Sequence, residues 1–300
     1  HSYAMSPPMS VLHDHNERRL RDLLVEGCVS ARMEEPTVPS DGSWGPVEAI
    51  DAILLAPEPL LGLETILDNG ALEQILPEVY AIVDFHKSCP VHHKDLWTHT
   101  LEVLERSKPE ANLRWAVLLH DVGKIETRAL DESGRVSFHG HEELGGTIMR
   151  EVGGRIGMSP ERIERIAIII ERHGRINAYT PQWSDRAVRR LIRESGPFLE
   201  DLLSFSGSDY TTRRRARQRR IAATLDHLSD RIDRLRQEDL SEVILPRGLG
   251  SEISVKLDIP PGPSIGKIIQ ELKRQIGLGT LERTASIDDL IEAARRSTVR

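Results

Sequence analysis

Apolar side chains recur at intervals of three and four residues in five separate parts of the chain. This spacing places them on one face of an α-helix. Helices are therefore predicted over Lys94–Arg106, Leu113–Asp121, the stretch that begins at His141, Ile163–His173 and Leu199–Asp209. Prolines and glycines separate further helical patterns, which run from Val47 to about Gln237. The pattern predicts an all-α fold.

Three parts of the chain depart from this pattern. The turn signal at residues 131–134 predicts a small hairpin or an ordered loop over Ala129–Phe138. The first 46 residues mix charge with Pro, Ser and Gly, so we expect a flexible tail with one short helix over Glu17–Leu24. Residues 1–5 are interpreted as a remnant of an expression tag. Gly and Pro become frequent again after Leu245, before a final pair of helices.

This organisation predicts four parts. They are a flexible N-terminal tail at 1–46, a helical lead-in at 47–90, the main helical domain at 91–237, and a small C-terminal helical region at 238–300.

Each of the five predicted helices carries a potential metal ligand on its apolar face or next to it. The six ligands are His99, His120, Asp121, His141, His173 and Asp209. A single histidine on an apolar face is usually a satisfied core side chain. Several imidazoles and carboxylates in one interior are costly unless a cation neutralises them, and no Lys or Arg is interleaved on these faces. The set therefore predicts a metal centre.

The ligand types and their number narrow the chemistry of this centre. Imidazole and carboxylate without thiolate suit Fe, Mn, Co, Ni, Zn or Mg, and they argue against a structural zinc site built on cysteine. Six ligands fit two divalent ions bridged by a shared carboxylate, and Asp121 is the expected bridge. We expect His99, His120, Asp121 and Asp209 to form one ion site, and His141 and His173 to complete a second.

The sequence around these ligands resembles that of HD-domain metal-dependent phosphohydrolases. The similar phrases are "LLHDVGK", "FHGHEELGG", "IIERHGRI" and "SGSDYTTRR". Together with "LDIPPGPSIGKIIQELKRQIGLGTLE", they resemble the C-terminal portion of bacterial tRNA nucleotidyltransferases that carry an HD domain. The resemblance extends from about Val47 to the C-terminus. It implies an HD-domain helical bundle at 91–237 with a small C-terminal helical appendix.

One departure from these transferases concerns their nucleotidyltransferase head, which is marked by Gly-Ser and a following Asp-x-Asp metal pair. Here Gly42-Ser43 is followed by Trp-Gly-Pro, without an Asp-x-Asp. We therefore expect the hydrolytic half to stand alone, without nucleotide addition.

Four residues near the ligands are candidates for binding substrate. Lys124 and His139 flank ligands along the chain, and Arg213 and Arg214 open a basic run after Asp209. Arginine and lysine hold phosphate oxygens through charge-assisted hydrogen bonds. Each also has an ordinary interpretation. Lys124 could be a surface lysine after a helix capped by Gly123, the loop histidine could face solvent, and the arginine run could be a solvated helix face.

The resemblance implies hydrolysis of a phosphate ester, with a nucleotide or a 2′,3′-cyclic nucleotide as substrate. A metal-activated water is the expected nucleophile, with Asp121 and Lys124 as catalytic residues. No Gly-x-Ser-x-Gly elbow or phosphate-binding Walker loop offers a different chemistry. Two alternatives stay open. One is a mixed-valent di-iron oxygenase with the same ligands, and the other is a non-catalytic nucleic-acid-binding module.

Composition adds expectations about partners and location. The net charge of −7 gives no general attraction to nucleic acid, so a small phosphorylated substrate is favoured over RNA. Cys28 and Cys89 suggest no disulfide framework and hence a reducing compartment. No apolar run approaches the roughly 20 residues of a membrane span. We expect a cytoplasmic protein without a membrane partner.

Overall fold

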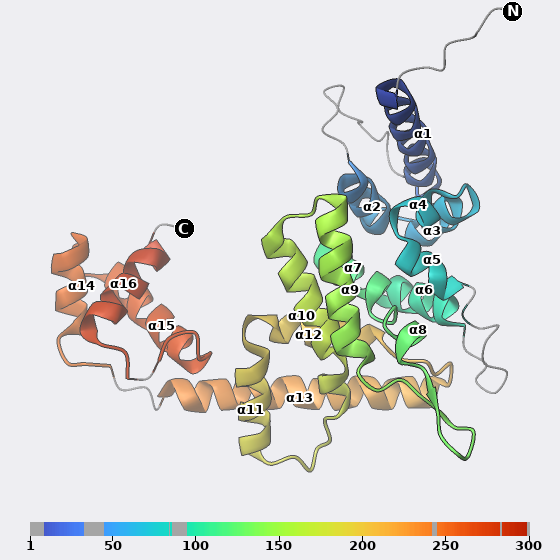
Figure 1. Cartoon of the computed structure of the whole chain (residues 1–300). Coiled ribbons are helices and arrows are strands. Elements are labelled where there is room, and N and C mark those ends of the chain that lie inside the picture. The colour runs from blue at the N-terminus through green and yellow to red at the C-terminus, as the bar shows by residue number, and fades with distance from the viewer. Residues whose placement is uncertain are drawn as a thin grey trace, which may run out of the picture. The chain divides into compact units, whose positions relative to one another are not determined.

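A computed structural model of the protein describes residues 9–32, 45–83, 85, 95–241, 245–282 and 284–298. These residues are helical apart from short connections and one two-stranded sheet, which confirms the predicted all-α fold (Figure 1). The chain forms two compact units. Unit 1 comprises residues 1–177 and 201–212, and unit 2 comprises residues 178–200 and 213–300.

Unit 1 contains the helices that carry the predicted ligands, together with the helices that precede them. Its elements are α1 (Met9–Ser30), α2 (Pro46–Leu55), α3 (Pro59–Asp68), α4 (Ala71–Ile75), α5 (Pro77–Val83), α6 (Leu96–Arg106), α7 (Ala111–Leu119), α8 (Lys124–Thr127), β1 (Ala129–Leu130), β2 (Val136–Ser137), α9 (His141–Ile156), α10 (Pro160–Asn177) and most of α12 (Leu199–Ser208). Several of these helices begin at a proline, whose fixed φ suits the first helical position and which has no N–H to leave unpaired there.

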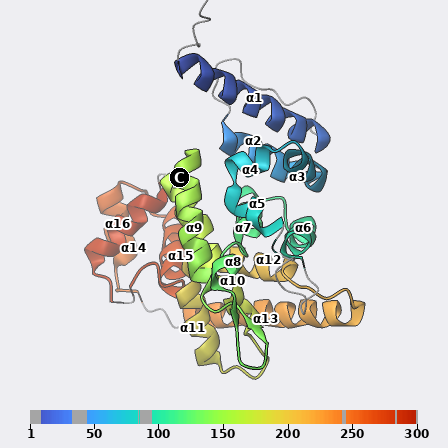
Figure 2. The same ribbon diagram turned by 45° about the vertical axis from the view of Figure 1, so that its right-hand side comes forward.

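Within the predicted tail at 1–46, residues 9–30 form helix α1, while residues 1–8 and 33–44 lie outside the described part of the chain. Helix α1 is 22 residues long rather than a short helix over Glu17–Leu24, and it packs against α3 and α2, above which it lies in Figure 2. At the crossing, a Cβ on Gly27 would lie 3.2 Å from the carbonyl oxygen of Gly62, so the two backbones touch. Leu24 and Cys28 are buried there. A contact between distant glycines leaves no periodic apolar stripe, which explains why the sequence pattern missed it.

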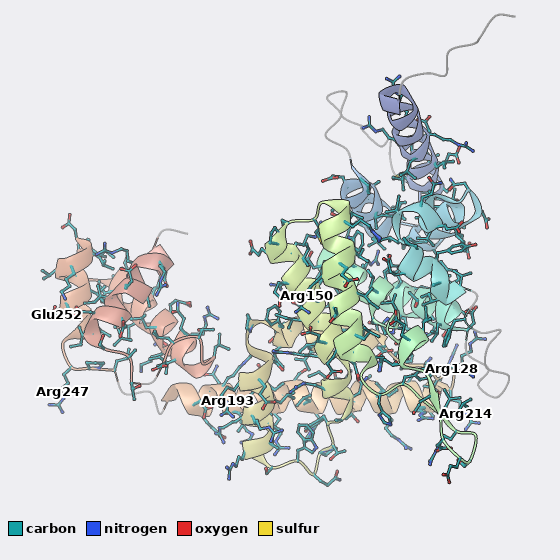
Figure 3. The ribbon with its side chains drawn as sticks, in the orientation of Figure 1. Arg128, Arg150, Arg193, Arg214, Arg247 and Glu252 are labelled. Atoms are coloured by element: carbon teal, nitrogen blue, oxygen red, sulfur yellow. The ribbon has the colours of Figure 1, made fainter. Side chains whose placement is uncertain are left out.

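Helices α9 and α10 form the most tightly packed pair in unit 1. Gly145 and Gly153 let them approach, because a Cβ at either position would lie 2.9 Å or less from an isoleucine side chain of α10. Arg150, labelled on α9 in Figure 3, pairs with Glu164 and Glu171 of α10. His141 at the start of α9 and His173 near the end of α10 are thereby held on a rigid helix pair.

The predicted hairpin at 129–138 is confirmed. Ala129 pairs with Ser137 and Leu130 with Val136 in an antiparallel arrangement. The Asp131 carboxylate closes the turn by accepting hydrogen bonds from the backbone N–H groups of Ser133 and Arg135, both at 2.9 Å. The hairpin joins α8 to α9, both of which carry predicted site residues.

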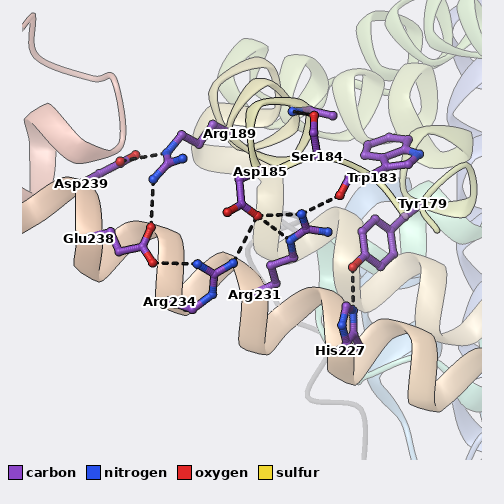
Figure 4. Close-up of polar contacts among 11 residues, drawn as sticks. Tyr179, Trp183, Ser184, Asp185, Arg189, His227, Arg231, Arg234, Glu238 and Asp239 are labelled. Carbon is purple, nitrogen blue, oxygen red and sulfur yellow. Dashed lines mark hydrogen bonds and ion pairs between the residues drawn. The ribbon is translucent and has the colours of Figure 1, made fainter. Parts of the chain in front are cut away.

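Unit 2 is built on one long helix. Its elements are α11 (Asp185–Ser195), the 3₁₀ turn η2 (Gly196–Phe198), α13 (Arg215–Ser241), α14 (Leu249–Leu257), α15 (Pro263–Gly277) and α16 (Ile287–Thr298). Ion pairs fasten α11 to α13: Asp185 bonds Arg231 and Arg234, and Arg189 bonds Glu238 and Asp239 (Figure 4). Apolar residues of α14, α15 and α16 form a small core of their own.

The borders between the two units differ from the borders predicted at 90/91 and 237/238. The units part after residues 177, 200 and 212, because α11 packs on α13 in unit 2, whereas α12 returns to unit 1. None of the described helices is both long enough and apolar enough to cross a membrane.

Candidate metal centre

The six predicted ligands all lie in unit 1 and come together in its interior. His99 lies on α6, His120 caps the end of α7 and Asp121 follows it, while His141 begins α9. His173 lies on α10, and Asp209 directly follows α12. Their potential ligand atoms form two groups of three, each with all atoms within 4.8 Å of one another. One group is His99, His120 and Asp209, and the other is Asp121, His141 and His173.

Asp121 lies between the two groups and is fully buried. Its Oδ2 is 3.3 Å from Nε2 of His120 and 3.9 Å from Nε2 of His99. Its Oδ1 is 4.0 Å from Nε2 of His141. One oxygen thus faces each group, which is the arrangement that a bridging carboxylate needs. By distance Asp121 groups with His141 and His173, whereas the sequence interpretation assigned it first to the His99 set.

Three of the histidines are oriented in the same way, each by the backbone carbonyl three residues before it. Nδ1 of His120 lies 2.7 Å from the Val117 carbonyl oxygen, and Nδ1 of His173 lies 2.7 Å from that of Ile170. Nδ1 of His141 is 2.9 Å from the carbonyl oxygen three residues earlier, at the end of the hairpin. A carbonyl only accepts, so Nδ1 carries the proton and the lone pair is on Nε2. In known metal sites, a hydrogen bond from the ring nitrogen that does not bind the metal orients the histidine in this way.

His99 is the exception. Its Nδ1 is buried and has no hydrogen-bond partner, and its Nε2 lies 3.2 Å from Oδ1 of Asp209. Nε2 of His120 is likewise buried without a hydrogen bond. Buried polar atoms without partners are rare and costly. Their gathering here is the structural observation that fits a cation among these side chains.

The protonation states of the buried groups suit metal binding. Burial lowers the pKa of His173 to about 4, and the nearby charge of His120 adds to this. Burial by itself raises the pKa of Asp209, but the hydrogen bond from His99 and the neighbouring imidazoles bring it down to about 2. Metals bind neutral imidazole and ionised carboxylate. Both side chains are therefore in the binding form at neutral pH.

His120 and Asp121 shift each other's pKa values in opposite directions. Burial lowers the pKa of His120, but the charges of Asp121 and Asp209 outweigh it, so the pKa is raised. Burial raises the pKa of Asp121, but His120 and Lys124 hold it well below its ordinary range. Without a metal, the carboxylates therefore favour a proton on His120, which an ion would have to displace.

Phe205 of α12 forms one wall of the site, and the sequence analysis did not single it out. Its ring centroid lies 5.5 Å from that of His120 and 5.3 Å from that of His173. The side chain is completely buried. Its position, three residues after Leu202 on the apolar face of α12, was the signal that could have found it.

Arg106 of α6 is a second residue that the sequence analysis missed. Its Nη1 donates to the carbonyl oxygens of Ser208 and Tyr210, both at 2.9 Å, and these residues flank Asp209. The guanidinium also lies 4.2 Å from the centroid of the Tyr210 ring. The helix that carries His99 thus also holds the backbone on both sides of Asp209. No sequence spacing connects these residues, which are about a hundred positions apart.

Lys124, predicted to contact substrate, lies directly on Asp121. Its Nζ is 2.7 Å from Oδ1 and 2.8 Å from Oδ2 of that carboxylate. Gly123 does not end a helix as a left-handed cap, because its φ is −64°. It is needed for close approach instead, since a Cβ there would lie 2.3 Å from the backbone oxygen of His141.

The structure does not test the other predicted substrate contacts. His139 is exposed, two residues before α9. Arg213 and Arg214 belong to unit 2, whereas all six predicted ligands belong to unit 1. Their role in phosphate binding stays a prediction.

The fold and the site together define an all-helical protein in which histidine and aspartate side chains meet at one buried candidate metal centre. Residues 96–236 match the HD domain, and the chain therefore carries an HD domain. This confirms the resemblance inferred from the sequence.

The chain matches, among other relatives, two tRNA nucleotidyltransferases. It is 29% identical over 238 residues to an A-adding tRNA nucleotidyltransferase of Deinococcus radiodurans, covering 77% of this chain and 54% of that protein. It is 31% identical over 231 residues to a CC-adding tRNA nucleotidyltransferase of Thermus thermophilus, covering 75% and 50%. A multifunctional CCA protein of Halorhodospira halophila is 38% identical over 153 residues, or 49% and 33%. The chain spans about half the length of the first two relatives.

Proposed function

We propose that the protein is a metal-dependent phosphohydrolase that cleaves a phosphate ester of a nucleotide, including 2′,3′-cyclic nucleotides. The observation that carries this proposal is the pair of three-residue groups with the Asp121 carboxylate between them. The HD domain at 96–236 supports it, because such domains are typical of metal-dependent hydrolases.

The six residues would hold one or two divalent ions, and the Asp121 carboxylate lies between the two groups of residues. When bound, such ions supply a water of lowered pKa and hold phosphoryl oxygens. The chain's own part is to keep the ligands in place. The helix carbonyls of Val117 and Ile170 orient His120 and His173, and Phe205 keeps water from their buried side. Lys124 is proposed to bind a phosphoryl oxygen once it is no longer paired with Asp121.

The substrate class follows from the same residues and from the relatives. His139, Arg213 and Arg214 are proposed to contact phosphate, because charge-assisted bonds from arginine and histidine are the usual means of holding it. Nucleotides are favoured because the relatives are tRNA nucleotidyltransferases.

The test combines metal analysis with a substrate screen. Protein freed of metal by chelator is reloaded separately with Mn²⁺, Ni²⁺, Co²⁺ or Mg²⁺ and assayed on phosphomonoesters and on 2′,3′-cyclic nucleotides. We expect turnover with at least one ion, and its loss in His120→Ala and Asp121→Ala together with loss of bound metal. His227→Ala removes an exposed imidazole of unit 2 and serves as the matched control. No turnover with any ion, combined with oxygen consumption by the iron-loaded protein, would assign the site to an oxygenase.

RNA is a second candidate partner, and specific observations favour it. The first turns of α13 carry exposed arginines that no acidic residue in their turn neutralises. They are Arg215, Arg217, Arg219 and Arg220. The relatives named above act on tRNA. Binding of tRNA that weakens steeply with salt, and weakens further in Arg217→Ala/Arg220→Ala, would support an RNA substrate. Binding that is unaffected by this pair of changes would leave the arginines as a solvated helix face.

A further inference from the structure

The Lys124 ammonium is in contact with both oxygens of Asp121. The distances of 2.7 Å to Oδ1 and 2.8 Å to Oδ2 mean that it straddles the carboxylate. Asp121 is fully buried, so no water competes for these oxygens, and Lys124 is the one ammonium or guanidinium for which the described part of the chain records a contact with them. Beside the neighbouring imidazoles of His120 and His99, the buried charge is therefore compensated by one ammonium on a movable side chain.

The same two oxygens face the two candidate ion sites. Oδ2 lies near His99 and His120, and Oδ1 lies nearest to His141. An ion in either group would need one of these oxygens as a ligand. A divalent ion and an ammonium at contact distance on one carboxylate repel each other strongly where the dielectric is low. The ammonium and the ions therefore compete for Asp121.

We propose that Lys124 is an internal counter-cation, which pairs with the Asp121 carboxylate and is displaced from it when metal binds. This rests on the metal centre of the proposed function, but it requires no hydrolysis. The displacement releases a cation at the mouth of the site, where a phosphoryl group would need one. Lys124 would thus reach its substrate-binding position only in the metal-loaded protein.

The surroundings of Lys124 allow the side chain to leave while its backbone stays. Its side chain is 21% exposed, so a path to solvent exists. The Phe138 ring centroid lies 5.7 Å from Nζ, within the range in which an aromatic face attracts a cation. The backbone is fixed, because Gly123 packs against the backbone of α9 and Lys124 N–H donates to the Asp121 carbonyl oxygen at 3.0 Å.

The first experiment measures metal affinity without substrate. Mn²⁺ binding to chelator-stripped protein is titrated for the wild type, Lys124→Met and Lys124→Arg. Loss of the competing charge should tighten Mn²⁺ binding in Lys124→Met by about ten- to a hundredfold, the range expected for one charge-assisted contact. Lys124→Arg keeps the charge and should bind within about threefold of the wild type. Lys256→Met removes an exposed lysine that pairs with Asp288 in unit 2, and it should not change the affinity.

The second experiment uses only wild-type protein, so it holds even if Lys124→Met does not fold. The rate of amine acetylation at Lys124, relative to Lys256, is followed by mass spectrometry with and without Mn²⁺. We expect faster modification of Lys124 in the presence of metal. Unchanged acetylation, or Mn²⁺ affinity that is equal or weaker in a folded Lys124→Met, would overturn the proposal. Tighter Mn²⁺ binding without turnover of any phosphate ester would sustain it while refuting the hydrolase.

Discussion

Single side chains set the form in which the candidate ligands are present. Burial lowers the pKa of His173 from its ordinary 6.5 to about 4. The unfolded chain therefore takes up this proton below about pH 6.5, whereas the folded protein does not until about pH 4. The contribution of His173 to stability is complete above pH 6.5 and is lost as the pH falls to 4.

Two neighbours modify this dependence. Asp209, with its pKa lowered from 3.8 to about 2, contributes stability above pH 3.8 that is lost as the pH falls toward 2. The raised pKa of His120 acts in the opposite sense, since its contribution is complete below pH 6.5 and is lost as the pH rises. Its pH range lies above pH 6.5 and therefore does not overlap with that of His173.

We predict that the urea midpoint of metal-free protein falls between pH 6.5 and pH 4. The His173 part amounts to on the order of 3 kcal/mol over this pH range. In His173→Gln the same pH range should produce a clearly flatter curve. A wild-type midpoint that rises toward pH 4 would contradict the assignment of His173 as a neutral buried imidazole.

The contact between α8 and α9 depends on one glycine. Gly123→Ala would place a Cβ 2.3 Å from the His141 backbone oxygen and 3.0 Å from the Gly145 nitrogen. Backbone atoms cannot move aside cheaply, so we predict a loss of about 1–3 kcal/mol in the free energy of unfolding, together with weaker metal binding. Both follow because α9 carries His141 and the preceding residues carry Asp121.

Gly154→Ala on α9 is the matched control for this change. A Cβ there meets nothing within 4 Å, and the residue is exposed. It should stabilise the protein by about 0.5–1 kcal/mol, because alanine is the better helix former. Thermal unfolding of both variants, with and without Mn²⁺, checks the pair. If Gly123→Ala were as stable as Gly154→Ala, the close approach would not be a constraint.

Helix α6 positions two ligands, one directly and one through Arg106. We predict that Arg106→Met weakens metal binding by about ten- to a hundredfold, the range for residues that orient a ligand from behind, and that Arg106→Lys restores part of it. The reason is that the Ser208 and Tyr210 carbonyls on either side of Asp209 lose their shared donor. Arg155→Met, which breaks a comparable contact to Glu78 and Ile75, is the control and should keep wild-type affinity.

At the scale of the whole molecule, two of the candidate substrate contacts, Arg213 and Arg214, belong to a different unit from the candidate metal ligands. Arg213 belongs to unit 2, and all six predicted ligands belong to unit 1. We predict that Arg213→Ala slows turnover by roughly ten- to a hundredfold and leaves metal content unchanged, since a charge-assisted phosphate contact contributes about 1.5–3 kcal/mol. Elemental analysis beside steady-state kinetics checks this. Wild-type turnover in Arg213→Ala would assign the side chain to the surface.

Much of the fold could be predicted because its signals are local. Helical periodicity depends on residues three and four positions apart. The buried helix faces that contain Val103, Val117 and Ile170 could therefore be predicted from the sequence. The turn at Asp131–Gly134 likewise identified the hairpin. The six candidate ligands could be found for the same reason, since each interrupts an apolar face with a group that is costly to bury alone.

The remaining features depend on contacts between distant segments, and only the tertiary structure decides them. The grouping of Asp121 with His141 and His173 follows from how α7, α9 and α10 meet. The hold of Arg106 on the backbone around Asp209 and the packing of α1 through Gly27 leave no periodic trace. A residue's type determines what it can bind, but the distances that select its partner arise only when helices far apart in the chain pack together.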